Sequence, residues 1–167
     1  RAQQRVRQTL ARIRPGHTTA PPTKKSAWRP RPTPPECPPG WQVGPPDFVI
    51  VGAEKAGTSR WLRLLAEHPD VHLAMGMQEL HFFDEIAGRW QTQDDIDTYH
   101  RFFPRPPGAI TGEKTPQYMS LWWIPQMLAG AAPNARIIVM VRDPIDRYIS
   151  GRTQMEKYRA ISIERGL

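Results

Sequence analysis

The segment GAEKAGTSR at residues 52–60 has the composition of a loop that binds an anion. It lies between an apolar run and a helical pattern, so its backbone N–H groups would face outward at the start of a helix, where phosphates bind. Two glycines permit a tight turn, and a lysine and two hydroxyl groups could donate to oxygen atoms. These residues are Gly52, Gly57, Lys55, Thr58 and Ser59. The segment therefore predicts a phosphate-binding loop.

A second candidate for anion binding is the segment VRDPIDRYIS, which follows the most apolar strand pattern of the chain. Arg142 would leave the carboxyl end of that strand, where open parallel sheets bind ligands. Ser150 follows eight residues later, about two turns into the next helix. An arginine and a hydroxyl could together hold a second phosphate. Arg147 is expected instead to pair with Asp143 or Asp146 on the helix surface.

An alternation of strands and helices is needed to position these two segments. Short apolar runs predict strands at 47–52, 71–74, 109–116 and 135–144, and 80–83 could be a strand end or a buried turn. Apolar periodicity and proline positions predict helices at 59–69, 94–104, 120–131 and 145–160. Continuously apolar strands between helices indicate an α/β fold whose parallel sheet is covered on both faces.

Charge and proline are concentrated near the N-terminus. The net charge is +7, and residues 1–47 hold nine Lys or Arg, two acidic residues and eleven of the 19 prolines. Residues 48–167 are therefore neutral, with 14 basic and 14 acidic side chains, which argues against nucleic-acid binding. The single cysteine, Cys37, excludes an internal disulfide and a cysteine-rich zinc site. No apolar run reaches the ~18 residues that a membrane span needs.

The chain is predicted to divide into a tail at 1–46 and a domain at 47–167. Residues 1–14 place three apolar side chains at helical spacing among arginines. This pattern fits either a basic helix on an anionic membrane surface or a solvated helix. Residues 15–46 are rich in proline and predict an extended linker. PxxP-like spacings in this segment are also compatible with binding to a partner module.

Taken together, the two anion-binding segments resemble the 5′-phosphosulfate loop and the 3′-phosphate motif of sulfotransferases, which use 3′-phosphoadenosine 5′-phosphosulfate (PAPS). Two further segments resemble those of carbohydrate sulfotransferases of the heparan-sulfate type. QELHFF at 78–83 is similar to their Glu-x-His-Phe-Phe segment, and GEKTPQY at 112–118 to their Glu-Lys-Thr-Pro-x-Tyr segment. The four motifs cover about residues 47–153, and CPPGWQVGPPDFV is more similar to bacterial members than to Golgi members.

The resemblance implies a three-layer, P-loop-NTPase-like fold with a central parallel sheet. Family catalytic domains continue well past the motif that ends here at Ser150, and nothing after Ser150 matches their later part. The chain is therefore expected to be the N-terminal portion of such a domain, with the C-terminal part missing. A bacterial member would be cytoplasmic, whereas a location in the Golgi lumen would require an upstream membrane anchor.

The resemblance also implies transfer of a sulfuryl group from PAPS to a hydroxyl or amine of a carbohydrate, a glycolipid or another small acceptor, without a metal. In this function Glu79 would take the proton from the acceptor, Lys55 would stabilise the leaving oxygen, and Lys114 would contact the sulfuryl group. His81 would orient or assist, and Asp84 could hold the acceptor. A nearby anionic nucleotide would raise the pKa of Glu79. The residues that the resemblance assigns to the nucleotide are Lys55, Ala56, Gly57, Thr58, Ser59, Arg60, Arg142 and Ser150.

Two other functions stay open at this point. A nucleotide kinase or NTPase of the same architecture is disfavoured, because the loop lacks the Gly-Lys-Ser/Thr order of a Walker A motif. A non-catalytic module that binds a nucleotide is the second alternative. Single residues also have structural interpretations. His81 could be a core histidine, Glu113 is expected to be structural, and the Trp122–Trp123 pair could stack on a sugar or pack within the fold.

Overall fold

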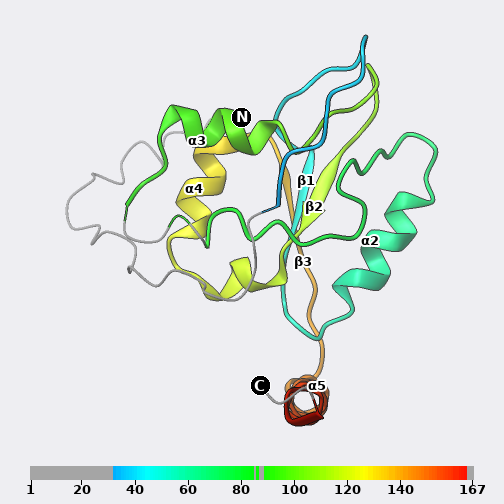
Figure 1. The fold of residues 1–167 in the computed structure, drawn as a ribbon, viewed down its shortest axis with the longest axis vertical. Coiled ribbons are helices and arrows are strands. Elements are labelled where there is room, and N and C mark those ends of the chain that lie inside the picture. The colour runs from blue at the N-terminus through cyan, green and yellow to red at the C-terminus, as the bar shows by residue number, and fades with distance from the viewer. Residues whose placement is uncertain (1–31, 85, 87–88, 165–167) are drawn as a thin grey trace, which may run out of the picture.

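The computed structural model of the chain describes residues 32–84, 86 and 89–164, and the side chains of these residues up to Tyr158. Within these ranges the chain forms a small parallel sheet with helices around it (Figure 1). The expected helix at residues 1–14 lies outside the described residues.

The sheet has three strands in the order β2-β1-β3, and both pairs are parallel. The central strand β1, Phe48–Gly52, is apolar and buried along its whole length. It pairs with β2, Gly112–Lys114, on one side and with β3, Arg136–Val139, on the other. The α/β fold with a central parallel sheet, expected from the sequence, is therefore confirmed.

In the described residues, five helices accompany the sheet. They are α2 (Thr58–Ala66), α3 (Gln93–His100), the 3-10 helix η1 (Pro116–Ser120), α4 (Ile124–Ala131) and α5 (Pro144–Glu164). Local sequence explains where several of them begin. Thr92 caps α3 through a hydrogen bond from the Asp95 N–H, and the Asp95 carboxylate accepts the Thr92 N–H in return. Pro125 lies in the first turn of α4, where the missing N–H of a proline breaks no helical hydrogen bond.

Helices lie on both faces of β1, which gives the described chain its three layers (Figure 1). Alternate side chains of the strand point to opposite faces. Phe48 and Ile50 pack with Leu62 of α2 in a small cluster. Val49 and Val51 join a larger aromatic core built with α3, η1 and α4. The layers hold the loop after β1 in a fixed position between the two cores.

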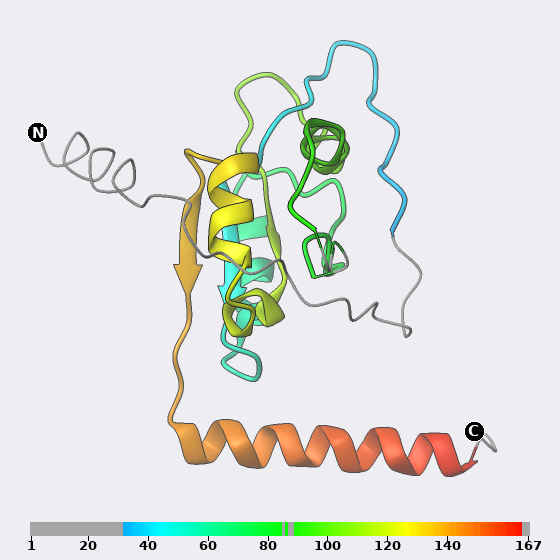
Figure 2. The same ribbon diagram turned by 90° about the vertical axis from the view of Figure 1, so that its left-hand side faces the viewer.

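The expectation that the sheet is covered on both faces is wrong for β3. Ile137 is 52% exposed and Val139 is 49% exposed, although their strand has the sequence of a buried one. The physical reason is that β3 is an edge strand, and α5 lies beyond the end of the sheet and does not pack on its face (Figure 2). The apolar side chains expected on one face of α5, which include Ile145 and Tyr148, are also exposed.

Of the short apolar runs, 71–74 differs from its prediction, and 80–83 takes one of its two predicted forms. Residues 71–74 form no strand, because only Val71 makes a single bridge, to Ile110. Residues 80–83 form a buried turn and not a strand end. The two residues of the tryptophan pair differ in burial. Trp123 is buried and its Nε1 donates to the Phe83 carbonyl, whereas Trp122 is exposed.

The chain already contacts the domain before the expected boundary at residues 46 and 47. The ring of Trp41 meets the ring of His72 edge-on, at 4.6 Å between centroids. Gln42 and Arg105 exchange backbone hydrogen bonds of 2.9 and 3.0 Å. The boundary stays a prediction, and these contacts favour a start at Trp41. None of the helices in the described residues is both long and apolar enough to cross a membrane.

Candidate functional site

The loop between β1 and α2 has the backbone that an anion-binding site needs. Lys55 and Gly57 have φ of 65° and 89°, in the left-handed region, and such residues turn successive N–H groups toward one point. No side chain caps the start of α2 at Gly57. Gly52 is required by close packing, because a Cβ there would lie 2.7 Å from Met119 Cβ and 2.9 Å from the Pro116 carbonyl oxygen.

A polar pocket of about 440 Å³ opens at this loop and is lined by residues from four parts of the chain. Among the residues predicted from the sequence, those that line it with a side chain are Lys55, Thr58, Ser59, Glu79, Arg142 and Ser150. Gly57 also lines it, whereas Ala56 and Arg60 do not. The pocket therefore joins the two segments that were expected to bind separate phosphates.

A chain of charged side chains begins at the wall of this pocket. Lys114 Nζ donates to Glu79 Oε1 at 2.7 Å and to Ser59 Oγ at 3.0 Å. The other carboxylate oxygen, Glu79 Oε2, lies 3.2 Å from His81 Nε2. His81 Nδ1 in turn lies 2.8 Å from Asp84 Oδ2. Three of the residues that were expected to be catalytic, Glu79, His81 and Lys114, therefore lie in one hydrogen-bonded series behind the loop after β1, whereas Lys55 contacts Gln154 instead.

The two ring nitrogens of His81 face two carboxylates, which stabilises the imidazolium. Hydrogen bonds to Asp84 and then to Glu79 raise the pKa of His81 to about 9, against the opposing effect of burial. The hydrogen bond from His81, followed by that from Lys114, lowers the pKa of Glu79 to about 2. This direction is opposite to the one expected beside an anionic nucleotide, because two cations contact the carboxylate directly.

One face of α5 lines the pocket beyond the residues found from sequence. Ser150, Gln154 and Tyr158 follow one another at a spacing of four residues, so they lie on the same side of the helix. Gln154 Oε1 accepts a hydrogen bond of 2.9 Å from Lys55 Nζ, and Gln154 Nε2 donates to the Tyr158 hydroxyl at 3.0 Å. Gln154 and Tyr158 were not predicted from the sequence, although their helical spacing from Ser150 could have indicated them.

The start of α5 also differs from expectation in its ion pairs. Among the described side chains, Asp146 lies 3.8 Å from Arg142 and does not pair with Arg147. Asp143 Oδ1 accepts the N–H groups of Ile145 and Asp146. Asp143 therefore caps the helix, because its carboxylate satisfies N–H groups that have no partner within the first turn.

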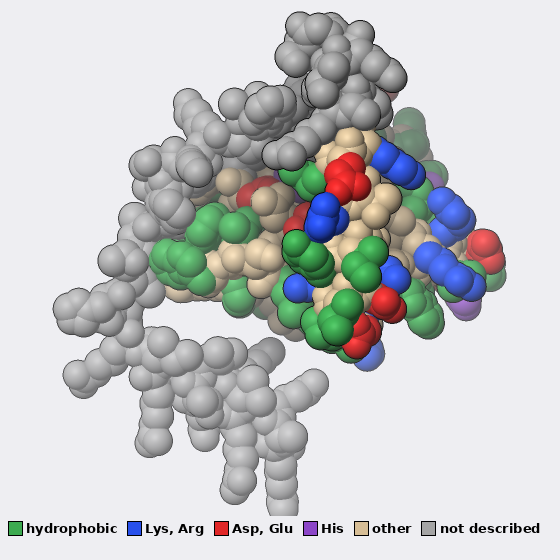
Figure 3. All heavy atoms as spheres, turned by 90° about the horizontal axis from the view of Figure 1, so that it is seen from below, with side chains coloured by type: hydrophobic (Ala, Val, Ile, Leu, Met, Phe, Trp, Pro, Cys, Tyr) green, Lys and Arg blue, Asp and Glu red, His purple; other side chains and the backbone are tan. Residues whose placement is uncertain are grey.

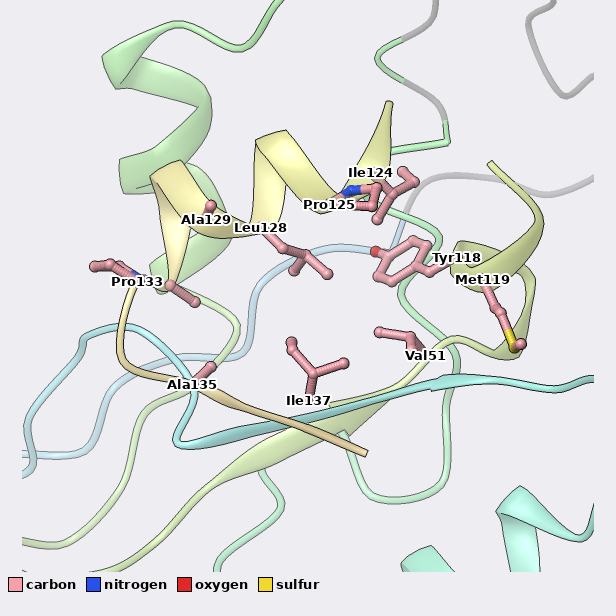
Figure 4. Close-up of a pocket in the computed structure, with 11 residues that line it drawn as sticks. Val51, Tyr118, Met119, Ile124, Pro125, Leu128, Ala129, Pro133, Ala135 and Ile137 are labelled. Carbon is pink, nitrogen blue, oxygen red and sulfur yellow. The ribbon is translucent and has the colours of Figure 1, made fainter. Parts of the chain in front are cut away.

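A second pocket, of about 350 Å³, lies between α4 and β3 on the other side of the sheet from α2 (Figure 4). Its lining is apolar and includes Val51, Leu128 and Ile137. None of the residues assigned to catalysis or to the nucleotide lines it. Seen from the side on which α5 lies, the surface mixes hydrophobic side chains with Lys, Arg, Asp and Glu (Figure 3).

Comparison with known proteins gives consistent similarities. Residues 45–162 match the family model described as "Sulfotransferase domain". The chain is 37% identical over 130 residues to "Heparan sulfate glucosamine 3-O-sulfotransferase 6" of Mus musculus, with 73% of this chain and 36% of the relative covered. It is 38% identical over 110 residues to "Heparan sulfate glucosamine 3-O-sulfotransferase 3B1" of Homo sapiens, with 65% of this chain and 26% of the relative covered.

Among solved structures, the chain is similar to a sulfotransferase from Alicyclobacillus acidocaldarius. The TM-score is 0.57 and the sequence identity is 28%, with 70% of this chain and 52% of the other covered. The chain therefore spans only about half of that structure, and 26–36% of the length of the two curated relatives above.

Proposed function

Because the chain belongs to the sulfotransferase domain family, we propose that it serves in the transfer of a sulfuryl group from PAPS to a hydroxyl or amine of a carbohydrate. The observation that carries this proposal is the polar pocket that both predicted anion-binding segments line at the loop after β1. Cationic and hydroxyl side chains line it from two sides, and the carboxylate of Glu79 faces it as well. A donor with two anionic groups and an acceptor with a proton to lose would both find partners there.

The pocket suits an anionic nucleotide at both ends. At one end the N–H groups at the start of α2 and the hydroxyls of Thr58 and Ser59 would hold the 5′ group. At the other end Arg142 and Ser150 would hold a 3′-phosphate. Lys55 lies between them, and its described partner is the neutral amide of Gln154, so its positive charge is available to oxygen atoms of the donor.

Glu79 is the group in this pocket that we assign to proton transfer. Its position in the wall of the pocket supports this role. Its pKa is lowered to about 2, so the carboxylate is ionised at neutral pH, although it is a weaker base than an ordinary carboxylate. Lys114 holds one carboxylate oxygen and would contact the sulfuryl group from that side. His81 fixes the other oxygen, so the carboxylate has a defined orientation. In-line transfer between two bound groups depends on such positioning.

A carbohydrate acceptor is the coarse assignment that the relatives support, since their names refer to heparan sulfate glucosamine. We propose the same class of amino-sugar polymer for this protein. A glycolipid acceptor, contact of residues 1–14 with a membrane and a cytoplasmic location stay predictions, because they depend on residues outside the described ranges or on the resemblance alone.

Binding of the product nucleotide tests the proposal most directly. Isothermal titration with adenosine 3′,5′-bisphosphate should show binding without a metal ion, and titration with ATP and Mg²⁺ should show much weaker binding. Tighter binding of ATP with Mg²⁺ would favour a kinase or NTPase. In the full-length protein, bisphosphate binding without transfer of ³⁵S from labelled PAPS to a heparan-type acceptor would favour a non-catalytic module.

Glu79→Gln separates chemistry from binding. In the full-length enzyme we expect this substitution to lower turnover by about 10²- to 10⁴-fold, because general-base catalysis commonly contributes that factor. Bisphosphate affinity should stay equal or rise, because the substitution removes a negative charge from a pocket that binds anions. Transfer assays and titrations on one preparation measure both quantities. Near-normal turnover would exclude Glu79 as the proton acceptor.

A further inference from the structure

A carboxylate is buried in the core directly behind the candidate site. Glu113 lies on β2 and is 3% exposed. Both of its oxygens accept hydrogen bonds from hydroxyl groups, since Tyr99 donates to Oε1 at 2.6 Å and Thr115 donates to Oε2 at 2.8 Å. No ion pair in the described part of the chain includes Glu113. The acid is thus fully buried and held by neutral donors.

A buried carboxylate held only by neutral donors destabilises a core relative to an apolar side chain. Burial removes the carboxylate from water, and two neutral hydroxyl groups restore only part of the lost solvation. Burial accordingly raises the pKa of Glu113 to about 7, with the hydroxyl hydrogen bonds opposing the change. An apolar residue or an amide would place less demand on stability. The location of Glu113 beside site residues therefore suggests a role other than filling the core.

Thr115 connects this acid to the candidate site. Its hydroxyl donates to Glu113, which directs its lone pairs away from the acid, and it accepts the backbone N–H of His81 at 3.4 Å. His81 has φ of 51°, a conformation that a residue with a side chain rarely adopts without support. The Tyr118 hydroxyl, three residues after Thr115, accepts the N–H of the next residue in the turn, Phe82, at 3.0 Å. The turn that carries His81 is therefore held by side-chain oxygens from the segment after β2.

We propose that Glu113 is a positioning residue of the site, which orients the Thr115 hydroxyl so that it fixes the backbone of His81 and, through the imidazolium, the carboxylate of Glu79. The expected effect on turnover rests on the proposed function, whereas the expected positioning of His81 by Glu113 and Thr115 does not. Lys114, the neighbour of Glu113 on β2, holds the other oxygen of Glu79. One strand end thus fixes both oxygens of that carboxylate, one directly and one through Thr115 and His81.

The first test replaces the connecting hydroxyl. Thr115→Val removes both hydrogen bonds at nearly constant shape, and Thr115→Ser keeps them. For Thr115→Val we expect turnover to fall about 10- to 100-fold, the loss typical of a catalytic group that is slightly misplaced. Bisphosphate affinity should stay near that of the wild type. The NMR titration of His81 should move below the wild-type pKa of about 9, because the ring is no longer held between its two carboxylates. Thr115→Ser should restore both quantities.

The second test acts on the acid itself. Glu113→Gln should reproduce the effects of Thr115→Val, and the double variant should lose no more than either single one, because the two residues act through one connection. Tyr99→Phe is the matched control, since it removes the other hydrogen bond to Glu113 and leaves that to Thr115. It should cost stability but leave the titration of His81 unchanged.

The outcomes separate this inference from the proposed function. If no preparation transfers sulfuryl groups, the titration of His81 still tests the positioning role. If transfer occurs but Thr115→Val has the turnover and the His81 titration of the wild type, Glu113 is not a positioning residue. An equal shift of His81 in Tyr99→Phe and in Thr115→Val would also overturn the inference, because general loosening of the core would then explain it. Should Glu113→Gln fail to fold, Thr115→Val and its Ser control carry the test.

Discussion

Lys55 is the residue whose charge we expect to contribute most to the binding of an anion in the pocket. It is half-buried in the loop after β1, and its ammonium group contacts the amide of Gln154. We expect Lys55→Ala to reduce bisphosphate affinity strongly and to leave the melting temperature nearly unchanged, because the side chain is not part of either apolar cluster. Lys157→Ala is the control, since it removes an exposed lysine that lines none of the described pockets. Unchanged affinity together with a lower melting temperature would contradict this role.

His81 makes stability depend on pH in a defined direction. Its pKa is raised from 6.5 to about 9, so the folded state binds the proton more tightly than the unfolded state. This contribution is fully present below pH 6.5 and is lost as the pH rises through about 9. Asp84→Asn removes the largest cause of the shift and should flatten the loss. Urea unfolding at several pH values between 6 and 9.5 measures it, and equal slopes for both proteins would contradict the prediction.

At the scale of elements, the tight approach of η1 to the end of β1 explains why the loop needs Gly52. Gly52→Ala would place a Cβ within 2.7 Å of Met119 and 2.9 Å of the Pro116 carbonyl, so the loop or η1 must shift. We expect loss of bisphosphate binding and a lower melting temperature. Gly108→Ala is the matched control, because Gly108 also has positive φ but a Cβ there meets nothing within 4 Å. Equal effects of both substitutions would show that backbone strain, and not the shift, is responsible.

The sequence predicted those elements whose signals are local. The strand, glycine loop and helix at 48–66 follow from an apolar run, a turn sequence and a helical pattern that adjoin one another. The buried turn at 80–83 and the failed strand at 71–74 depend on contacts with distant residues, such as the one between Val71 and Ile110. Short apolar runs do not distinguish these outcomes, because tertiary packing decides them.

The charged residues of the site could be predicted from the sequence, but the hydrogen bonds between them could not. Motif resemblance brought Lys55, Glu79 and Arg142 to attention, and the structure places them around one pocket. The resemblance did not indicate that His81 lies between two carboxylates. Asp84 and Glu79 contact opposite ring nitrogens of His81, whose backbone has a left-handed conformation that sequence does not indicate. The edge position of β3 was also not predictable, because an apolar strand reads the same at the centre and at the edge of a sheet.

At the scale of the whole molecule, the boundary between tail and domain can be located by truncation. Trp41 and Gln42 contact the domain through His72 and Arg105. Deletion of residues 1–40 should therefore leave the melting temperature unchanged, whereas deletion of residues 1–46 should lower it by several degrees, because it removes these contacts. Thermal unfolding of the two truncated chains beside the full chain measures the difference. An unchanged melting temperature after the longer deletion would place the boundary at residue 46, as the sequence alone suggests.

The exposed edge of β3 affects how the polypeptide behaves at high concentration. An unpaired strand edge presents a row of backbone donors and acceptors that another copy can match, and charged residues usually protect such edges. Arg136 is the one charged side chain of β3, and Ile137 and Val139 leave apolar surface beside the edge. Self-association through this edge should grow with concentration and compete with measurements made on the monomer. Dilute samples, or a lysine introduced at Val139, should keep the molecules apart without touching the polar pocket, which Val139 does not line.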